Sequence, residues 1–266
     1  ITIKHKMMRS GKNLRLKRFR KGFYGLWAKL VYGYPIYFDR TKKLLIDTLF
    51  ELANDDINTI ADLGGIYKVH GAYAFYTIQK HHVSKVIQID TELTQEYLDL
   101  SKKYNQILSL EMNFANTSVV SHIDKVDALY LFDVLLHQVN PNWDDILEMY
   151  SDKTKYFVIF NQMFTKSDKT IRLLDLGFDE YFKHVPFEKE HPLSQNLINK
   201  TYEINQEHGK IWRDVHHVFQ WGITVIDLIE SLRKLNFELV YHKYWGMFSY
   251  SKSFDDHAFI FKKKTI

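Results

Sequence analysis

Residues 59–71, which read TIADLGGIYKVHG, decide the fold of this chain. Their first half is a short apolar run typical of a buried strand, and that run stops at Gly64 and Gly65. Glycine adopts positive φ angles at little cost, so the chain can turn sharply there. The apolar and aromatic residues 72–78 then predict a helix packed against a sheet. A strand, a glycine turn and a helix in this order can seat a ligand on backbone N–H groups.

Length and composition predict a globular protein with one large core. The chain has 266 residues, of which 45% are hydrophobic, enough for one domain or for a domain with an insertion. It has no cysteine, which excludes a disulfide scaffold, a thiolate zinc site and a cysteine nucleophile, and which fits a cytosolic setting. No apolar run approaches the roughly 18 to 20 residues of a membrane span, so we expect a soluble or peripheral protein.

Positive charge is concentrated in the first 38 residues. Lysines and arginines from Lys4 to Lys21 precede the first acidic residue, Asp39, and a mixture of aromatic and aliphatic residues follows them up to Val31. This N-terminal arm, residues 1–38, could be a solvated lead into the first helix, or it could bind an anionic membrane surface through residues 4–29 or a phosphate-rich partner. It lacks the apolar core of a signal peptide.

The rest of the chain, residues 39–266, alternates strands with helices. Asp39 is a plausible N-cap for a helix over 40–53, and Asn140 with Pro141 predicts a later helix start. Strand–helix alternation at this spacing predicts a parallel sheet that helices cover on both faces. The chain ends in a predicted hairpin. The predicted strands are 59–63, 86–89, 107–112, 128–132, 156–160, 237–241 and 258–261.

Residues 162–222 interrupt this alternation. The segment is polar, aromatic and rich in histidine, and it is too long for a plain connection. We therefore expect an insertion with helices of its own that covers a site. Helical spacing resumes after Thr224, whose hydroxyl is a candidate N-cap.

With this order of elements, residues 59–263 resemble a class I S-adenosylmethionine-dependent methyltransferase. The resemblance implies an α/β fold: a seven-stranded, mostly parallel, doubly wound sheet that ends in an antiparallel hairpin, with an inserted helical substrate cover. The overall pattern also resembles bacterial methyltransferases of surface-polysaccharide pathways, which suggests a saccharide acceptor. The cofactor implied is S-adenosylmethionine.

The first motif of that family is an acidic residue, one further residue and then glycines. Asp62, Gly64 and Gly65 match it, whereas Ile66 and Lys68 stand where further glycines are common. By resemblance, the two glycines let the backbone approach the methionyl part of the cofactor, and Asp62 orients the cofactor's amino group.

The next motifs lie at the ends of the second, third and fourth strands. By resemblance, Asp90 accepts hydrogen bonds from the ribose hydroxyls, because a carboxylate is an acceptor only. Asn113 and Phe114 take the adenine position. Phe132 and Asp133 flank the cofactor near its sulfonium.

Histidines and tryptophans supply the candidates for the acceptor side. His137, just behind the fourth strand, would lie at the methyl-transfer mouth and could take a proton from a hydroxyl acceptor, or it could make a structural hydrogen bond. His216 and His217 are the other candidate bases, and Trp212 and Trp221 are candidate substrate contacts. No carboxylate or further histidine stands at a metal-ligand spacing, so no metal is predicted.

These observations predict a cytoplasmic enzyme, peripheral to the inner face of the membrane if the basic arm binds lipid. Its expected reaction is S-adenosylmethionine-dependent methylation, mainly O-methylation, of a small molecule or a saccharide. Nucleic acid is not the expected acceptor, because the tetrapeptide NPNW of residues 140–143 falls one helical turn late for an amino-methylating motif. An RNA or polyanion methyltransferase that uses the arm and a non-catalytic binding module are the alternatives. No oligomeric state is indicated.

Overall fold

A computed structural model describes residues 39–265 of the chain, apart from residues 55 and 217. The basic arm, residues 1–38, and its predicted membrane contact lie outside the described residues. Within the described ranges, no helix has both the length and the apolar character needed to cross a membrane.

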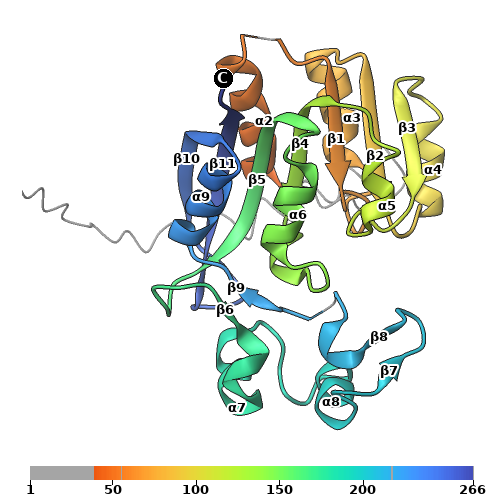
Figure 1. Ribbon diagram of the computed structural model, residues 1–266. Coiled ribbons are helices and arrows are strands. Elements are labelled where there is room, and N and C mark those ends of the chain that lie inside the picture. The colour runs from red at the N-terminus through yellow and green to blue at the C-terminus, as the bar shows by residue number, and fades with distance from the viewer. Residues whose placement is uncertain (1–38, 55, 217, 266) are drawn as a thin grey trace, which may run out of the picture.

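The centre of the molecule is a seven-stranded sheet in the order β10-β11-β5-β4-β1-β2-β3 (Figure 1). Strands β1 to β5 pair in parallel, and β11 runs antiparallel to both of its neighbours, β5 and β10. The predicted fold class is therefore confirmed, including the antiparallel hairpin at the end of the chain. The strands are β1 (Thr59–Leu63), β2 (Lys85–Asp90), β3 (Ile107–Glu111), β4 (Val126–Phe132), β5 (Thr154–Phe164), β10 (Phe237–Met247) and β11 (Phe254–Lys263).

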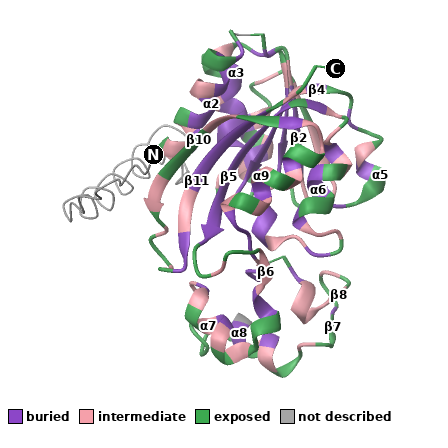
Figure 2. Ribbon diagram, turned by 60° about the vertical axis from the view of Figure 1, so that its left-hand side comes forward, coloured by how far each residue is buried: buried purple, intermediate pink, exposed green. Residues whose placement is uncertain are grey.

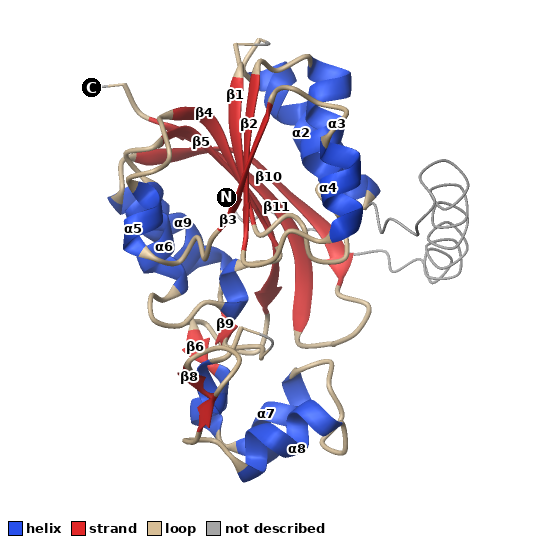
Figure 3. Ribbon diagram, turned by 90° about the vertical axis from the view of Figure 1, so that its right-hand side faces the viewer, coloured by secondary structure: helices blue, strands red, loops and turns tan. Residues whose placement is uncertain are grey.

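Helices cover both faces of the sheet, as Figure 3 shows in profile. One side carries α2 (Arg40–Leu52), α3 (Ala72–His81) and α4 (Gln95–Ser101), and the other carries α5 (Thr117–Val120), α6 (Trp143–Tyr150) and α9 (Val225–Lys234). Side chains of β1 and β4 alternate between the two layers, since Ile60 and Tyr130 pack with α2 and α3 while Leu63 and Leu131 pack with α6. The central strands are accordingly buried almost throughout (Figure 2).

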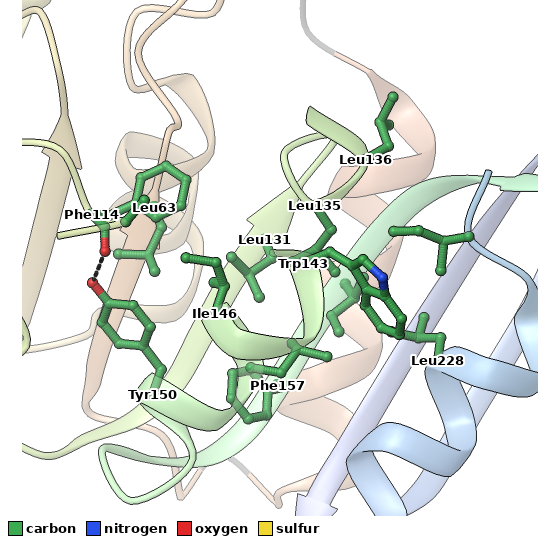
Figure 4. Close-up of a cluster of buried hydrophobic side chains, with 14 of the residues drawn as sticks. Leu63, Phe114, Leu131, Leu135, Leu136, Trp143, Ile146, Tyr150, Phe157 and Leu228 are labelled. Atoms are coloured by element: carbon green, nitrogen blue, oxygen red, sulfur yellow. Dashed lines mark hydrogen bonds between the residues drawn. The ribbon is translucent and has the colours of Figure 1, made fainter. Parts of the chain in front are cut away.

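The layer beneath α6 and α9 is the larger core. Ile146 from α6 and Leu228 from α9 meet Leu131 of β4 and Phe157 of β5, all fully buried (Figure 4). At the edge of this cluster the Tyr150 hydroxyl donates to the Phe114 carbonyl at 2.7 Å. This bond ties α6 to the segment that follows β3.

The N-caps predicted from the sequence are confirmed for α2, which Asp39 caps, and for α9, and the predicted start is wrong for α6. Thr224 caps α9 as predicted, with its hydroxyl accepting from the Asp227 backbone N–H at 3.2 Å. Helix α6, however, begins at Trp143 with Asn142 as its N-cap, not at Asn140 and Pro141. The Asp145 carboxylate accepts the Asn142 backbone N–H at 2.8 Å, and this pairing fixes the later start.

The segment between β5 and α9 lies below the sheet in Figure 1. Strand β5 continues to Phe164, so this segment begins after Phe164 and not at residue 162. It contains short strands and helices that contact the sheet near the carboxyl ends of β4 and β5 and at the start of β11. Its elements are β6 (Ile171–Arg172), η2 (Leu173–Leu176), α7 (Phe178–His184), α8 (Pro192–Asn199), β7 (Ile204–Asn205), β8 (Lys210–Ile211), η3 (Trp212–Asp214) and β9 (Trp221–Gly222).

Candidate active site

The carboxyl ends of β4, β1 and β2 lie side by side and bring the predicted motif residues together. Leu63 of β1 pairs with Ile89 of β2, so the next residues, Gly64 and Asp90, are neighbours across the two strands. The Gly64 backbone N–H donates to the Ile89 carbonyl at 2.8 Å. On the other side of β1 lies β4, which ends at Phe132. Gly64 and Asp90 therefore lie side by side at the carboxyl ends of the parallel strands.

Close packing explains both glycines of the turn. Gly64 has φ +75°, and a Cβ there would lie 2.8 Å from Val134 Cγ1 and 3.3 Å from the Phe114 ring. A Cβ at Gly65 would lie 2.2 Å from a carboxylate oxygen of Asp62. No larger residue fits either position without a local shift. Ile66 is fully buried in a separate cluster with α3 and α4.

Asp62 is the most unusual charged residue of the site. Its side chain is fully buried, and neither carboxylate oxygen has a hydrogen-bond partner within the part of the chain that the structure describes. Gln88 donates at 3.3 Å to the Asp62 backbone carbonyl. Burial raises the pKa of the Asp62 carboxyl group from 3.8 to about 7; the neighbouring Gln88 amide opposes this rise and the Asp90 carboxylate adds to it. A buried acceptor of this kind lacks the cation or donor that would normally satisfy it.

Asp90 is half-buried at the end of β2 and holds the glycine turn in place. One of its oxygens accepts the Ile66 backbone N–H at 2.9 Å, and the other accepts the Thr91 backbone N–H at 2.8 Å. Burial raises the pKa of Asp90, while these backbone hydrogen bonds oppose the rise. A carboxylate has about four lone-pair sites, so Asp90 can accept from ligand hydroxyls in addition to these backbone donors.

Asn113 and Phe114, the second and third residues after β3, differ in their roles. The Phe114 ring is buried and lies against Gly64, so it forms a wall of the same edge. The Asn113 side chain is engaged locally, because its Oδ1 accepts the Ala115 backbone N–H at 3.0 Å. Asn113 therefore shapes the turn that presents Phe114.

Asp133 directly follows β4 and has the left-handed φ of +59°. Lys42 of α2 donates to one of its carboxylate oxygens, and Gln162 of β5 donates to the other at 2.8 Å. We did not expect Lys42 or Gln162 from the sequence. A detectable pattern existed for Lys42, since it precedes the buried Leu45 and Ile46 by three and four residues and so shares their helix face.

His137 connects the end of β4 to the inserted segment. It lies in a short 3₁₀ helix, η1 (Leu135–His137), and its Nδ1 is 2.9 Å from the Val218 carbonyl. Its ring meets the Phe219 ring edge-on at 5.1 Å between centroids. The Trp221 indole N–H donates at 2.6 Å to the Gln138 carbonyl. Residues 218–221 thus dock on the loop behind Asp133.

The structure does not bring the remaining candidates into one place. Trp212 lines a cavity of about 110 Å³ inside the inserted segment, together with Tyr181 and Phe187. Trp221 lines a different groove, against α6 and α9. His216 is exposed, and His217 lies outside the described residues. Among the residues that are described, no group of three or more histidine, aspartate or glutamate side chains could hold a metal ion.

Comparison with known proteins identifies the fold. No protein-family model and no curated protein sequence matches the chain. Among solved structures, the N-terminal domain of EvdMO1 with S-adenosylhomocysteine bound superimposes with a TM-score of 0.54 at 11% identity, over 85% of this chain and 82% of that one.

Two further structures are similar over nearly the whole chain. The 1,6-didemethyltoxoflavin-N1-methyltransferase of Burkholderia thailandensis, solved with its acceptor and S-adenosylhomocysteine, gives a TM-score of 0.53 at 11% identity over 99% of this chain and 94% of that one. The magnesium protoporphyrin IX methyltransferase of Synechocystis PCC 6803, with S-adenosylhomocysteine, gives 0.51 at 10% identity over 93% and 100%. The chain thus has the fold of class I S-adenosylmethionine-dependent methyltransferases.

Proposed function

We propose that this protein transfers a methyl group from S-adenosylmethionine to a small-molecule or saccharide acceptor, with O-methylation as the expected reaction. The observation that carries the proposal is the buried Asp62 carboxylate, which has no partner in the described chain and lies directly beneath the glycine turn. An ammonium group of a ligand would supply the missing partner. The fold and the neighbouring Asp90 support the same ligand.

The residues at this edge match the chemistry of the parts of that cofactor. Asp62 would hold its amino group, Asp90 its ribose hydroxyls, and Phe114 its adenine ring. When bound, the cofactor supplies a methyl group already activated by a sulfonium. The chain's own task is to align the acceptor, exclude water and remove a proton where the acceptor is a hydroxyl.

His137 is our candidate for the proton-accepting group. When the neutral ring donates from Nδ1 to the Val218 carbonyl, Nε2 is its basic nitrogen. The contacts between residues 218–221 and the η1 region bring the inserted segment up to the end of β4. This arrangement supports a role for the inserted segment as the substrate cover, with His216, His217, Trp212 and Trp221 as further candidates for acceptor contacts.

The saccharide acceptor has one further support. The N-terminal domain of EvdMO1, with a TM-score of 0.54 at 12% identity, was also solved in the presence of S-adenosylhomocysteine and D-fucose. Mass spectrometry of small molecules that co-purify with the protein would test the acceptor class. A nucleotide oligomer in place of a sugar or other small molecule would overturn it.

Location is the second part of the proposal. We infer cytoplasmic residence with contact to an anionic membrane surface through residues 4–29, supported by the basic and then aromatic composition of that stretch. Sedimentation with vesicles that contain phosphatidylserine should retain the full chain at low salt and release it as salt rises. Equal retention by neutral vesicles would contradict an electrostatic contact.

The cofactor assignment is tested by calorimetry with S-adenosylmethionine and S-adenosylhomocysteine. We expect both to bind with a dissociation constant well below about 100 μM, which corresponds to ~5.5 kcal/mol. Asp90→Asn should weaken binding about tenfold, because it loses an acceptor while still receiving the Ile66 N–H. Glu111→Gln is the matched control, since Glu111 pairs with Asp90 across β2 and β3 but is exposed. Absence of heat with either compound would overturn the proposal.

A further inference from the structure

A buried lysine lies beside the carboxyl end of β4, and the cofactor motifs assign it no role. Lys42 projects from α2, and only 9% of its side chain is exposed. Its ammonium lies 5.5, 5.9 and 5.2 Å from the ring centroids of Tyr73, Phe132 and Phe160. Three aromatic faces and one carboxylate thus surround a positive charge inside the protein.

The partner of Lys42 is a carboxylate that the fold holds rigidly. Asp133 accepts from Lys42 on one oxygen and from Gln162 on the other, and its backbone N–H donates to the Phe160 carbonyl at 2.8 Å. These donors come from α2, on one face of the sheet, and from β5, the strand beside β4. Gln162 also donates to Asp256 at 3.3 Å, which fixes its amide. Asp133 therefore has one orientation, and 37% of its side chain faces solvent.

The two charges balance one another. Burial by itself would lower the pKa of Lys42, but the Asp133 carboxylate, together with Tyr73 and Asp39, outweighs burial and raises the pKa above its ordinary value. Lys42 is thus a permanent cation at physiological pH. At the carboxyl end of β4, the buried Lys42 ammonium therefore neutralises most of the negative charge of Asp133. An unpaired carboxylate at the same position would present its full charge.

We propose that Lys42 is a positioning residue that aims the Asp133 carboxylate at the cofactor's sulfonium and offsets its charge, so that the site does not strongly favour the charged cofactor over its neutral product. The inference rests on the proposed function. S-Adenosylmethionine carries a sulfonium and S-adenosylhomocysteine a neutral thioether, so a net charge beside the sulfur changes the ratio of their affinities. A balanced pair keeps the ratio of the two affinities close to one, so that bound S-adenosylhomocysteine can be replaced by S-adenosylmethionine.

Removing either half of the pair should change that ratio in opposite directions. Lys42→Met leaves the carboxylate uncompensated, so we expect the preference for S-adenosylmethionine to rise about tenfold. Asp133→Asn leaves the ammonium uncompensated, so the preference should fall about tenfold. Lys42→Arg keeps the charge and should restore a ratio close to that of the wild type, and the double variant Lys42→Met with Asp133→Asn should also lie near it.

The experiment is calorimetric titration of each full-length variant with both compounds, with far-UV circular dichroism to verify folding. Lys102→Met is the matched control, because Lys102 also pairs with an aspartate, Asp99, but 71% of its side chain is exposed. It should leave the ratio unchanged. A purely structural role for Lys42 would lower the melting temperature without opposite shifts in the affinity ratio.

The outcomes separate this inference from the proposed function. If the wild type binds neither compound, the proposed function fails. If the wild type binds both, and Lys42→Met and Asp133→Asn shift the ratio in the same direction or leave it unchanged, the inference fails and the proposed function stands. Should Lys42→Met not fold, Asp133→Asn and Lys42→Arg still decide the question, because an unchanged ratio in Asp133→Asn contradicts the inference.

Discussion

Two carboxylates end neighbouring strands of the same sheet, yet the protein treats them in opposite ways. Asp62, the penultimate residue of β1, is fully buried, and its carboxylate has no hydrogen-bond partner in the described chain. Asp133, just after β4, is partly exposed and accepts from both Lys42 and Gln162. The protein therefore supplies hydrogen-bond partners to the more exposed carboxylate, Asp133, and none to the buried one, Asp62.

The difference indicates which interactions the fold completes by itself and which it leaves to a ligand. Desolvating an unpaired carboxylate is costly, and the pKa of Asp62, raised to about 7, records that cost. Asp133 needs no ligand to be held in place. We infer that the β1 end is built to receive a cation and the β4 end to present a fixed charge.

The largest expected effect is on the pH dependence of stability at Asp62. Its carboxyl group has a pKa of about 7 in the folded protein and 3.8 as the ordinary value. The folded state holds its proton to higher pH than the unfolded state, so its contribution to stability is present at low pH and is lost as pH rises from about 4 through 7. At about 1.4 kcal/mol per pKa unit, the loss is ~4 kcal/mol.

Asp62→Asn should remove that loss. Urea unfolding at pH 4 and pH 8 should show the variant gaining ~4 kcal/mol relative to the wild type between the two pH values. In addition, an ammonium ligand that pairs with Asp62 should release about half a proton per site on binding at pH 7, because a group with a pKa of about 7 is half protonated there. Calorimetry in buffers of different ionisation enthalpy reports this release. Parallel pH profiles for the two proteins would contradict the burial argument.

Asp133→Asn should act in the opposite direction on stability. The variant leaves the buried Lys42 ammonium without its counter-charge, and breaking a buried pair from one side is destabilising. We expect a loss of about 2 kcal/mol, below the full cost for a buried pair because 37% of the Asp133 side chain is exposed. Urea unfolding at pH 7 measures it. An increase in stability would show that the Asp133 carboxylate, like that of Asp62, costs the folded protein free energy.

A smaller effect separates backbone strain from close packing at the glycine turn. Gly64 and Gly209 have φ values of +75° and +61°, but only at Gly64 would a Cβ meet other atoms within 4 Å. Gly209→Ala should cost about 1 kcal/mol through the positive φ alone. Gly64→Ala should cost about 1 kcal/mol more because of the overlap with Val134. Equal losses in thermal unfolding would mean that Val134 moves aside freely.

The smallest expected effect concerns the inserted segment. Trp212 lines the cavity within that segment and not the strand ends that carry Asp62 and Asp133. Trp212→Ala should therefore change the affinity for S-adenosylhomocysteine by less than about twofold, whereas Asp90→Asn changes it about tenfold. Calorimetry on both variants makes the comparison. A tenfold loss in Trp212→Ala would place the cavity in the cofactor site.

Sequence reasoning succeeded where structure follows from local pattern. The apolar run that ends at Gly64 predicted β1 and its turn, and strand–helix alternation predicted the sheet, because buried parallel strands are continuously apolar. Parallel strands also end at one edge, so placing Asp62, Asp90 and Asp133 at strand ends was enough to predict that they would gather there.

The rest depends on contacts between distant parts of the chain. Lys42 and Asp133 are 91 residues apart, and no local pattern predicts that an ammonium from α2 will reach the end of β4. Strand β5 continues through the buried polar residues Asn161 and Gln162, which an apolar run cannot detect. The contacts that place His137 and Trp221 likewise join segments about 80 residues apart, at separations of 81 and 83.

Helix α2 also determines how far the chain can be shortened from its N-terminal side without changing the carboxyl end of β4. A protein shortened to begin at Thr59 would retain all the strands that the structure describes but would lack the Lys42 ammonium beside Asp133 and the Asp39 N–H that donates to the Tyr73 hydroxyl at 3.1 Å. Asp133 would then face three uncovered rings and solvent. The smallest unit that preserves this edge therefore begins at Asp39, twenty residues before the first strand.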